Sequence, residues 1–213
     1  KVSTTLTATS ATVEIAGGIA GIFSGTLGSV QMSDVTVKSG TVAGGVVGSA
    51  ENAQLDGVVF NGTVSAETAG GILNNPLGTS VKDCFVGGSV KGEKLGAGVI
   101  AEIGRNPAFI AKTDKTLIKN TVVAAKAEAE NSAAVIAKAD KDTFSDSDKA
   151  SSKILSEVYY SSYQNESVFG TQELNSYQKS GFTAVDLSSM SCTLGGTEKS
   201  FITLNGENAV LGD

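Results

Sequence analysis

The stretch Ala16-Gly17-Gly18-Ile19-Ala20-Gly21 returns along the chain at a nearly constant interval. Related copies occupy residues 43–48 (AGGVVG), 69–74 (AGGILN) and 96–101 (GAGVIA), and a glycine-free copy occupies residues 132–137 (SAAVIA). The second small residue of the copies falls at Gly18, Gly45, Gly71, Gly98 and Ala134, so the intervals are 27, 26, 27 and 36 residues. Self-similarity at a period of roughly 20 to 50 residues is typical of a solenoid.

A second pattern runs in phase with these glycine-rich boxes. It consists of an apolar residue, two others, an apolar or small residue, one other and a further apolar residue, and its copies begin at Met32, Leu55, Val81, Ile118 and Leu155. The third place is often Asp or Asn, whose side chain can bond nearby backbone and tighten a corner. After the corner, apolar residues alternate with others, which predicts a strand with one buried face.

The pattern predicts an all-β fold: a parallel, right-handed β-helix solenoid of about 26-residue coils with a C-terminal cap. Short segments at residues 40–42, 62–64 and 88–90 supply a third strand between the two patterns. Three strands of four to six residues and three turns fill about 26 residues, because strands are commonly this short. Helical repeats of similar period need helices of ten or more residues, whereas Gly, Val and Thr dominate residues 16–100.

The chain divides into a solenoid over residues 1–163 and a capping region over residues 164–213, where the repeat stops. A solenoid end exposes strand edges and needs a cap, and we expect a short helix with Thr171 as its N-cap and a few irregular strands. Residues 102–116 and 138–153 are expected to be surface insertions. Residues 124–139 are rich in Ala, Glu and Lys and suit a helix by propensity, but a coil with Ala in place of Gly is favoured.

Composition excludes several classes of function. The net charge is −6 and Arg105 is the sole arginine, so the chain lacks the basic surface that binds nucleic acid. No apolar run reaches the roughly 18 residues that span a bilayer, so no membrane insertion is expected. His is absent, which removes the usual general base and the commonest nitrogen ligand of metals. The first residue is Lys, which suggests a fragment of a longer protein.

Few side chains suggest chemistry, and we assign no catalytic, cofactor-binding or metal-binding residue and expect no cofactor. Asp34, Asp56 and Asp83 lie in successive copies and can form a carboxylate ladder, although corner residues that bond the backbone are favoured. The acidic segment around Asp140 and Asp142 can bind a hard cation, although a solvated charged loop is favoured.

The aromatic cluster of residues 158–163 (VYYSSY) suggests a candidate ligand surface. The strand register directs Tyr160 inward and Tyr159 outward, and exposed Tyr side chains bind sugars or proteins. The candidate ligand surface therefore comprises Tyr159, Tyr163, Asp140 and Asp142, although filling of the core is favoured for the tyrosines. Cys84 and Cys192 are expected to be two buried thiols, and one bridge between them is the alternative.

Residues 81–90 (VKDCFVGGSV), followed by residues 96–99 (GAGV), resemble the GLUG-motif family of bacterial secreted and cell-surface proteins. Residues 44–48 (GGVVG) are a second close copy, and residues 168–174 and 182–187 are similar to the family's ending. The chain departs from the family at Asn74-Asn75 and at Ala133-Ala134, and an aromatic residue follows the motif Cys only at Phe85. The resemblance implies a β-helix in an extracellular or cell-surface bacterial setting. Similar repeats occur in immunoglobulin-A-cleaving metalloproteases, but their HExxH site cannot exist in a chain without His.

These observations predict a non-catalytic module that acts as an adhesive surface or as a spacer. Its expected partners are a host glycan or protein and other domains of the same polypeptide. The alternatives are an accessory or catalytic β-helix of a carbohydrate-active enzyme and the repeat arm of a large secreted protease. The ligand itself is not specified by any motif.

Overall fold

The computed structural model describes residues 5–7, 14–103, 117–139, 155–161, 167–170, 182–185, 191–194, 197–204 and 208–211. These residues form strands and turns and contain no helix. The strands are β1 (Thr5–Thr7), β2 (Ile15–Gly17), β3 (Ala20–Gly28), β4 (Gln31–Lys38), β5 (Val42–Gly44), β6 (Val47–Asp56), β7 (Val59–Gly70), β8 (Leu73–Leu77), β9 (Ser80–Lys82), β10 (Phe85–Ala97), β11 (Ile100–Ile103), β12 (Leu117–Val123), β13 (Lys126–Glu128), β14 (Asn131–Ala133), β15 (Ile136–Ala139), β16 (Leu155–Ser161), β17 (Phe182–Val185), β18 (Ser191–Leu194), β19 (Thr197–Leu204) and β20 (Asn208–Leu211).

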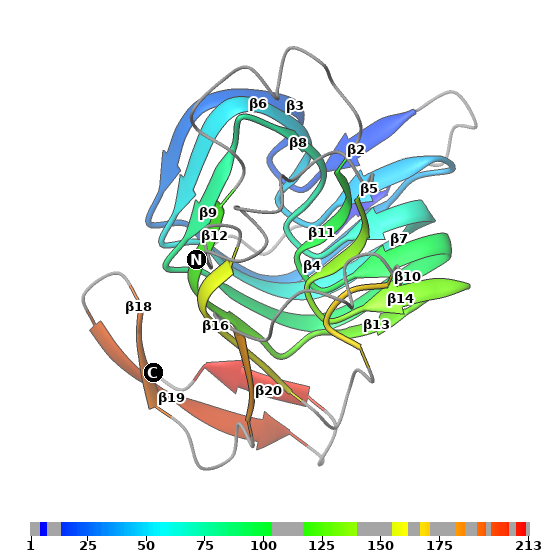
Figure 1. The fold of residues 1–213 in the computed structure, drawn as a ribbon. Helices are drawn as coiled ribbons and strands as arrows, with labels where there is room; N and C mark the ends of the chain where they lie inside the picture. The colour runs from blue at the N-terminus through cyan, green and yellow to red at the C-terminus, as the bar shows by residue number, and fades with distance from the viewer. Residues whose placement is uncertain are drawn as a thin grey trace.

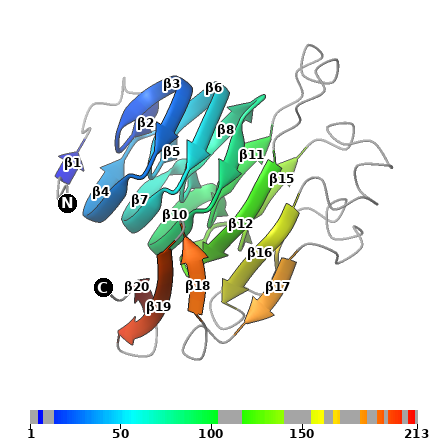
Figure 2. The same ribbon diagram turned by 90° about the vertical axis from the view of Figure 1, so that its left-hand side faces the viewer.

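The chain is a parallel β-solenoid of about five turns, which confirms the predicted fold class. Strands β1 to β17 belong to one sheet that wraps around the core, and each strand pairs in parallel with strands of the neighbouring coils. Figure 1 shows successive coils behind one another, and Figure 2, turned by 90°, shows them side by side from β3 to β17. Successive coils stack about 4.8 Å apart, as paired strands do.

The box residues form continuous columns across the coils. Val47 pairs with Leu73, Leu73 with Ile100 and Ile100 with Ile136, so the register follows the repeat that the sequence shows. The glycine-free copy continues this column through β14 and β15. Residues 124–139 are therefore a coil rather than a helix, because Ala replaces Gly without a change of register.

The third residue of the box must be small, because a large side chain from a strand across the core occupies the space where its own side chain would lie. A Cβ atom built on Gly45 would lie 2.1 Å from the carbonyl oxygen of Gly71 and 2.7 Å from the Phe60 ring. Gly18 faces the Met32 side chain in the same way. The glycine box therefore acts through packing, since a residue without a Cβ atom lets the strands on opposite sides of the core lie close together.

The longer coils take up their extra residues at one corner. Ile103 pairs with Ala139, and Ile118 pairs with Leu155. The two long connections, one in each coil, therefore leave the sheet and return to it at equivalent positions. The expected insertions began at residues 102 and 138, but Glu102 and Lys138 are still paired strand residues. The rest of both insertions lies outside the described residues.

Two expectations about the register were wrong. Residues 62–64 and 88–90 are not separate strands but parts of the long strands β7 and β10. Of residues 40–42, only Val42 belongs to a strand, where it begins β5. The first copy of the corner pattern begins at Leu27, which pairs with Leu55, and not at Met32, which pairs with Phe60. Asp34 caused the error, because it is an extra residue at a bulge in β4 and mimics the corner.

The C-terminal region contains two kinds of strand. β17 pairs in parallel with β16 and so continues the solenoid. β18, β19 and β20 form a separate antiparallel sheet, which lies below the solenoid in both views. β20 lies against β10. The expected helix from Thr171 lies outside the described residues, and the boundary between solenoid and cap stays a prediction.

Candidate functional site

Tyr159 points out of the solenoid, whereas Tyr160 packs against the core, as the strand register predicts. The Tyr160 ring lies 6.4 Å from the Phe182 ring, centroid to centroid. Tyr159 is half-buried and pairs with Val122 on one side and with Thr183 on the other. Its role in a ligand surface stays a prediction. The other three residues of that surface, Tyr163, Asp140 and Asp142, lie outside the described residues.

Tyr159 ends an outward column of apolar residues that begins at Val59 and passes through Phe85 and Val122. Phe85 and Val122 are fully buried, yet they are not part of the core inside the coils. β20 lies against β10, so the C-terminal sheet lies beside the strand that carries Phe85 (Figure 2). Sequence reasoning missed the column, although Phe85-Val86 and Val122-Val123 place apolar residues on both faces of a strand.

The three carboxylates of the expected ladder do not share a column. Asp56 pairs with Gly28 and Lys82, Asp34 lies at the bulge in β4, and Asp83 lies at a corner. The register therefore separates the groups that a ladder would bring together.

One corner recurs in every coil, between β3 and β4 in the first and between β6 and β7 in the second. The residue at this corner has a left-handed backbone conformation in each coil. The φ angles of these residues lie between 43° and 67°, and the residues are Ser29, Gly57, Asp83, Asn120 and Glu157. The Asn120 Nδ2 donates to Asp83 Oδ1 over 2.6 Å, which joins two successive coils. Asp83 and Asn120 thus have the corner role that the sequence predicts, since Asn and Asp adopt this backbone region more readily than other side chains.

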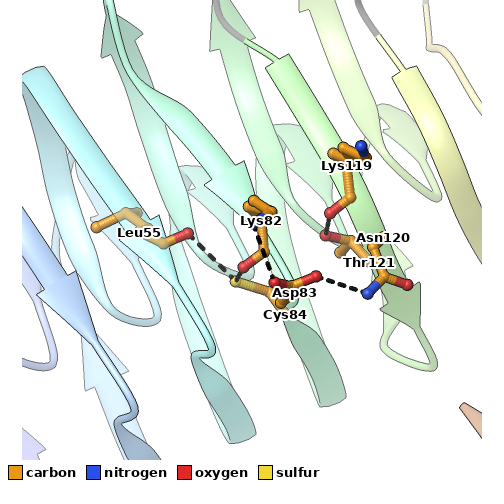
Figure 3. A network of polar contacts seen from close by, with 7 residues as sticks. All are labelled: Leu55, Lys82, Asp83, Cys84, Lys119, Asn120 and Thr121. Carbon is orange, nitrogen blue, oxygen red and sulfur yellow. Dashed lines mark hydrogen bonds and ion pairs between the residues drawn. The ribbon is translucent and has the colours of Figure 1, made fainter. Parts of the chain in front are cut away.

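Cys84 follows this corner and points into the core (Figure 3). Its Sγ lies 3.0 Å from the carbonyl oxygen of Lys82 and 3.6 Å from that of Leu55, so the thiol donates to backbone. Burial raises the pKa of the thiol to about 12. A protonated, buried thiol is a poor nucleophile. Cys84 is free, so no disulfide joins it to Cys192.

Thr121 repeats the arrangement of Cys84 one coil further on. Its Oγ1 donates to the carbonyl oxygen of Lys119 over 3.0 Å, as Cys84 does to Lys82 (Figure 3). Thr121 is fully buried as well. The two residues therefore have the same structural role: each buried side-chain donor is hydrogen-bonded to the backbone carbonyl two residues earlier.

The outer face of the coils carries polar columns and ion pairs. Thr36, Thr63 and Ser89 align on successive coils and alternate with the buried residues Val37, Val64 and Val90. Lys138 forms an ion pair with Glu102 of the neighbouring coil. Lys94 pairs with Glu67 at 2.5 Å, and Lys126 pairs with Glu128 at 2.8 Å. The hydrogen bond from Lys94 to Glu67 raises the pKa of Lys94, and that from Lys126 lowers the pKa of Glu128. Exposed pairs of this kind contribute little stability.

Within the described ranges, no three His, Cys, Asp or Glu side chains gather as they would around a metal ion. In the same part of the chain, no helix is long and apolar enough to cross a membrane.

Comparison of the chain with protein-family models, with curated proteins and with solved structures finds no match. The β-solenoid that the GLUG-motif resemblance implies is confirmed by the structure. The membership in that family, and the bacterial and extracellular setting that goes with it, stay predictions.

Proposed function

We propose that the chain is a non-catalytic β-solenoid module of a bacterial secreted or surface-attached protein, where it acts as an adhesive surface or as a spacer. The observation that carries the proposal is the uninterrupted core. Val47, Leu73, Ile100 and Ile136 are fully buried and directly stacked on successive coils. Each coil buries its neighbour's apolar face, so the rod keeps its shape without a ligand.

The polar groups near the core also support a structural role. The Cys84 thiol and the Thr121 hydroxyl each donate to a backbone carbonyl, and Asn74 Nδ2 donates to the carbonyl of Thr68 over 3.0 Å. Buried polar groups that are satisfied by backbone hold a fold in place. In this proposal, the outer column of Thr36, Thr63 and Ser89 is one surface on which a glycan or a protein would bind.

The proposal is tested by a binding screen of the purified chain against host glycans and extracellular-matrix proteins. Three variants accompany it: Tyr159→Ala, the pair Asp140→Asn and Asp142→Asn, and the triple change of Thr36, Thr63 and Ser89 to Ala. Binding at micromolar affinity or tighter that one variant removes supports the adhesive surface and locates it. The variants must keep the circular dichroism and unfolding midpoint of the wild type for this interpretation.

A screen in which nothing binds rejects the adhesive role for these ligands and leaves the spacer. The spacer requires a rigid rod, so small-angle scattering should give the particle length that the stacked coils predict. Turnover of any polysaccharide in the panel contradicts the non-catalytic role.

A further inference from the structure

We propose that the two ends of the solenoid bind each other, so that a second copy of this chain stacks head to tail on the first. This inference is independent of the adhesive role. It rests on the state of the core at the two ends, on the backbone groups that the ends present and on the register that relates them.

The hydrophobic core is incomplete at both ends and complete between them. Phe23, Leu27 and Val30 in the first coil are only partly buried, while Leu55 and Val58 in the same columns one coil further on are fully buried. At the other end, Tyr160 and Phe182 are likewise only partly buried against the same core. The described large hydrophobic residues that are most exposed, Ile22 at 71 % and Ile19 at 44 %, both lie at the N-terminal end.

The N-terminal edge also presents unpaired backbone. In the described part of the chain, β2 and β3 pair only with β5 and β6, their neighbours on one side. Among the described strands, β1 is the one that pairs with this edge of β4, and it covers Thr36–Lys38 without reaching Gln31. Such an edge is a template for a further strand.

The register identifies a hydrogen bond that would join two copies. The N–H groups of Val59, Phe85 and Val122 donate to the carbonyls of Val30, Val58 and Cys84 in the coil before. Gln31 stands first in the column of those donors. Phe182 pairs with Val158 and is the last described residue in the column of those acceptors. The Gln31 N–H of one copy therefore meets the Phe182 carbonyl of the next, in parallel and in register.

We infer that the partner at each end is a second copy of this chain. The chain carries the donor edge of the coil-to-coil interface at one end and the acceptor edge at the other. The contact is heterologous, so it does not close and it produces a growing linear assembly. The net charge of −6 opposes the association of copies. Added salt screens this repulsion, so the assembly should grow with ionic strength as well as with concentration.

Sedimentation velocity and light scattering of the full chain, from micromolar to millimolar concentration and at low and high salt, test the proposal. The wild type should show mass that increases with both variables. Gln31→Pro removes the donor that the second copy needs and should stay monomeric, since proline is tolerated where an edge N–H faces solvent. Gln31→Ala keeps the N–H group and should associate like the wild type.

A second pair of variants keeps the test decisive if Gln31→Pro does not fold. Ile22→Lys places a charge at the open edge and should weaken association at least tenfold, while Gln54→Lys adds the same charge on the exposed face of the next coil and should not. Folded Gln31→Pro added in small amounts should shorten wild-type assemblies, because it can still offer its C-terminal end but not extend further.

A wild type that stays monomeric at all concentrations and salt levels overturns the proposal. So does association that Gln31→Pro and Ile22→Lys leave unchanged, or that the two control variants weaken equally.

Discussion

At the scale of single residues, the glycine of the box decides how closely two walls of the coil approach. Gly45 has no room for a Cβ atom, because the Gly71 carbonyl and the Phe60 ring occupy that space. Gly40 lies on the outside of a corner, and a Cβ atom built there meets nothing within 4 Å. The two glycines therefore differ in what they contribute, although the sequence alone does not rank them.

Gly45→Ala should lower the free energy of unfolding by about 3 kcal/mol, the upper end of the usual cost of overpacking, because backbone must move. Gly40→Ala should change it by less than about 0.5 kcal/mol. Urea unfolding followed by circular dichroism measures both. Equal effects of the two changes would show that the box glycines do not act through packing.

Cys84 shows how a thiol can serve as a small core residue. Because the folded-state pKa of about 12 lies above the ordinary value of 9.0, the thiol's contribution to stability is complete below pH 9. That contribution is lost as the pH rises from 9 toward 12, because the unfolded chain releases the proton first.

The unfolding free energy of the wild type should therefore fall between pH 9 and pH 12 by up to about 1 kcal/mol per pH unit more than that of Cys84→Thr. Thr121 shows that Thr fits this column, so Cys84→Thr should fold normally. In a Cys192→Ser background, Cys84 should react with a thiol reagent only at the rate of unfolding. Fast labelling of the folded chain, or identical pH profiles, would contradict the buried donor.

At the scale of structural elements, the corner column fixes where each coil turns. Gly57 occupies the left-handed region at no steric cost, and Asp83 and Asn120 tolerate it. Glu157 adopts the same backbone angle, with φ of 55°, and has an exposed side chain. A long side chain in this region is strained by about 1 kcal/mol, so this corner is less well suited to its residue than the others.

Glu157→Gly should raise the free energy of unfolding by about 0.5–1 kcal/mol, because the relief of strain exceeds the added entropy of the unfolded chain. Glu157→Ala removes the same side-chain atoms but keeps the Cβ atom, and should bring no gain. Paired urea titrations of the two variants distinguish backbone strain from lost side-chain contacts. A gain of similar size in both would rule out strain at this corner.

The elements that the sequence predicts best are those whose side chains repeat. The box recurs with a constant length, and four corners from Gly57 to Glu157 are in the predicted register. The first corner was misplaced because Asp34 combines a bulge with the same left-handed backbone, with φ of 58°. A single sequence cannot separate a corner from a bulge, since both place Asp or Asn where the chain bends.

At the scale of the whole molecule, the chain has an inner core and a second apolar layer. The outward column passes from Val59 through Phe85 and Val122 to Tyr159. The strand that carries Phe85, β10 (Phe85–Ala97), lies against β20 (Asn208–Leu211), far along the chain, so local periodicity does not reveal this contact. The same limit applies to the prediction of the candidate surface at Tyr159. Its outward direction follows from the strand pattern, but what lies beside it depends on distant contacts.

The central claim is that successive copies of the repeat stack in register. The most direct measurement is disulfide trapping between outward positions of one column, in a background with Cys84→Thr and Cys192→Ser. Thr36→Cys with Thr63→Cys places two Cα atoms about 4.8 Å apart, within the range of a disulfide. This pair should oxidise quickly and completely. Thr36→Cys with Ser89→Cys spans two coils and should stay reduced. Crosslinking of the second pair, or none in the first, would contradict the stacked register.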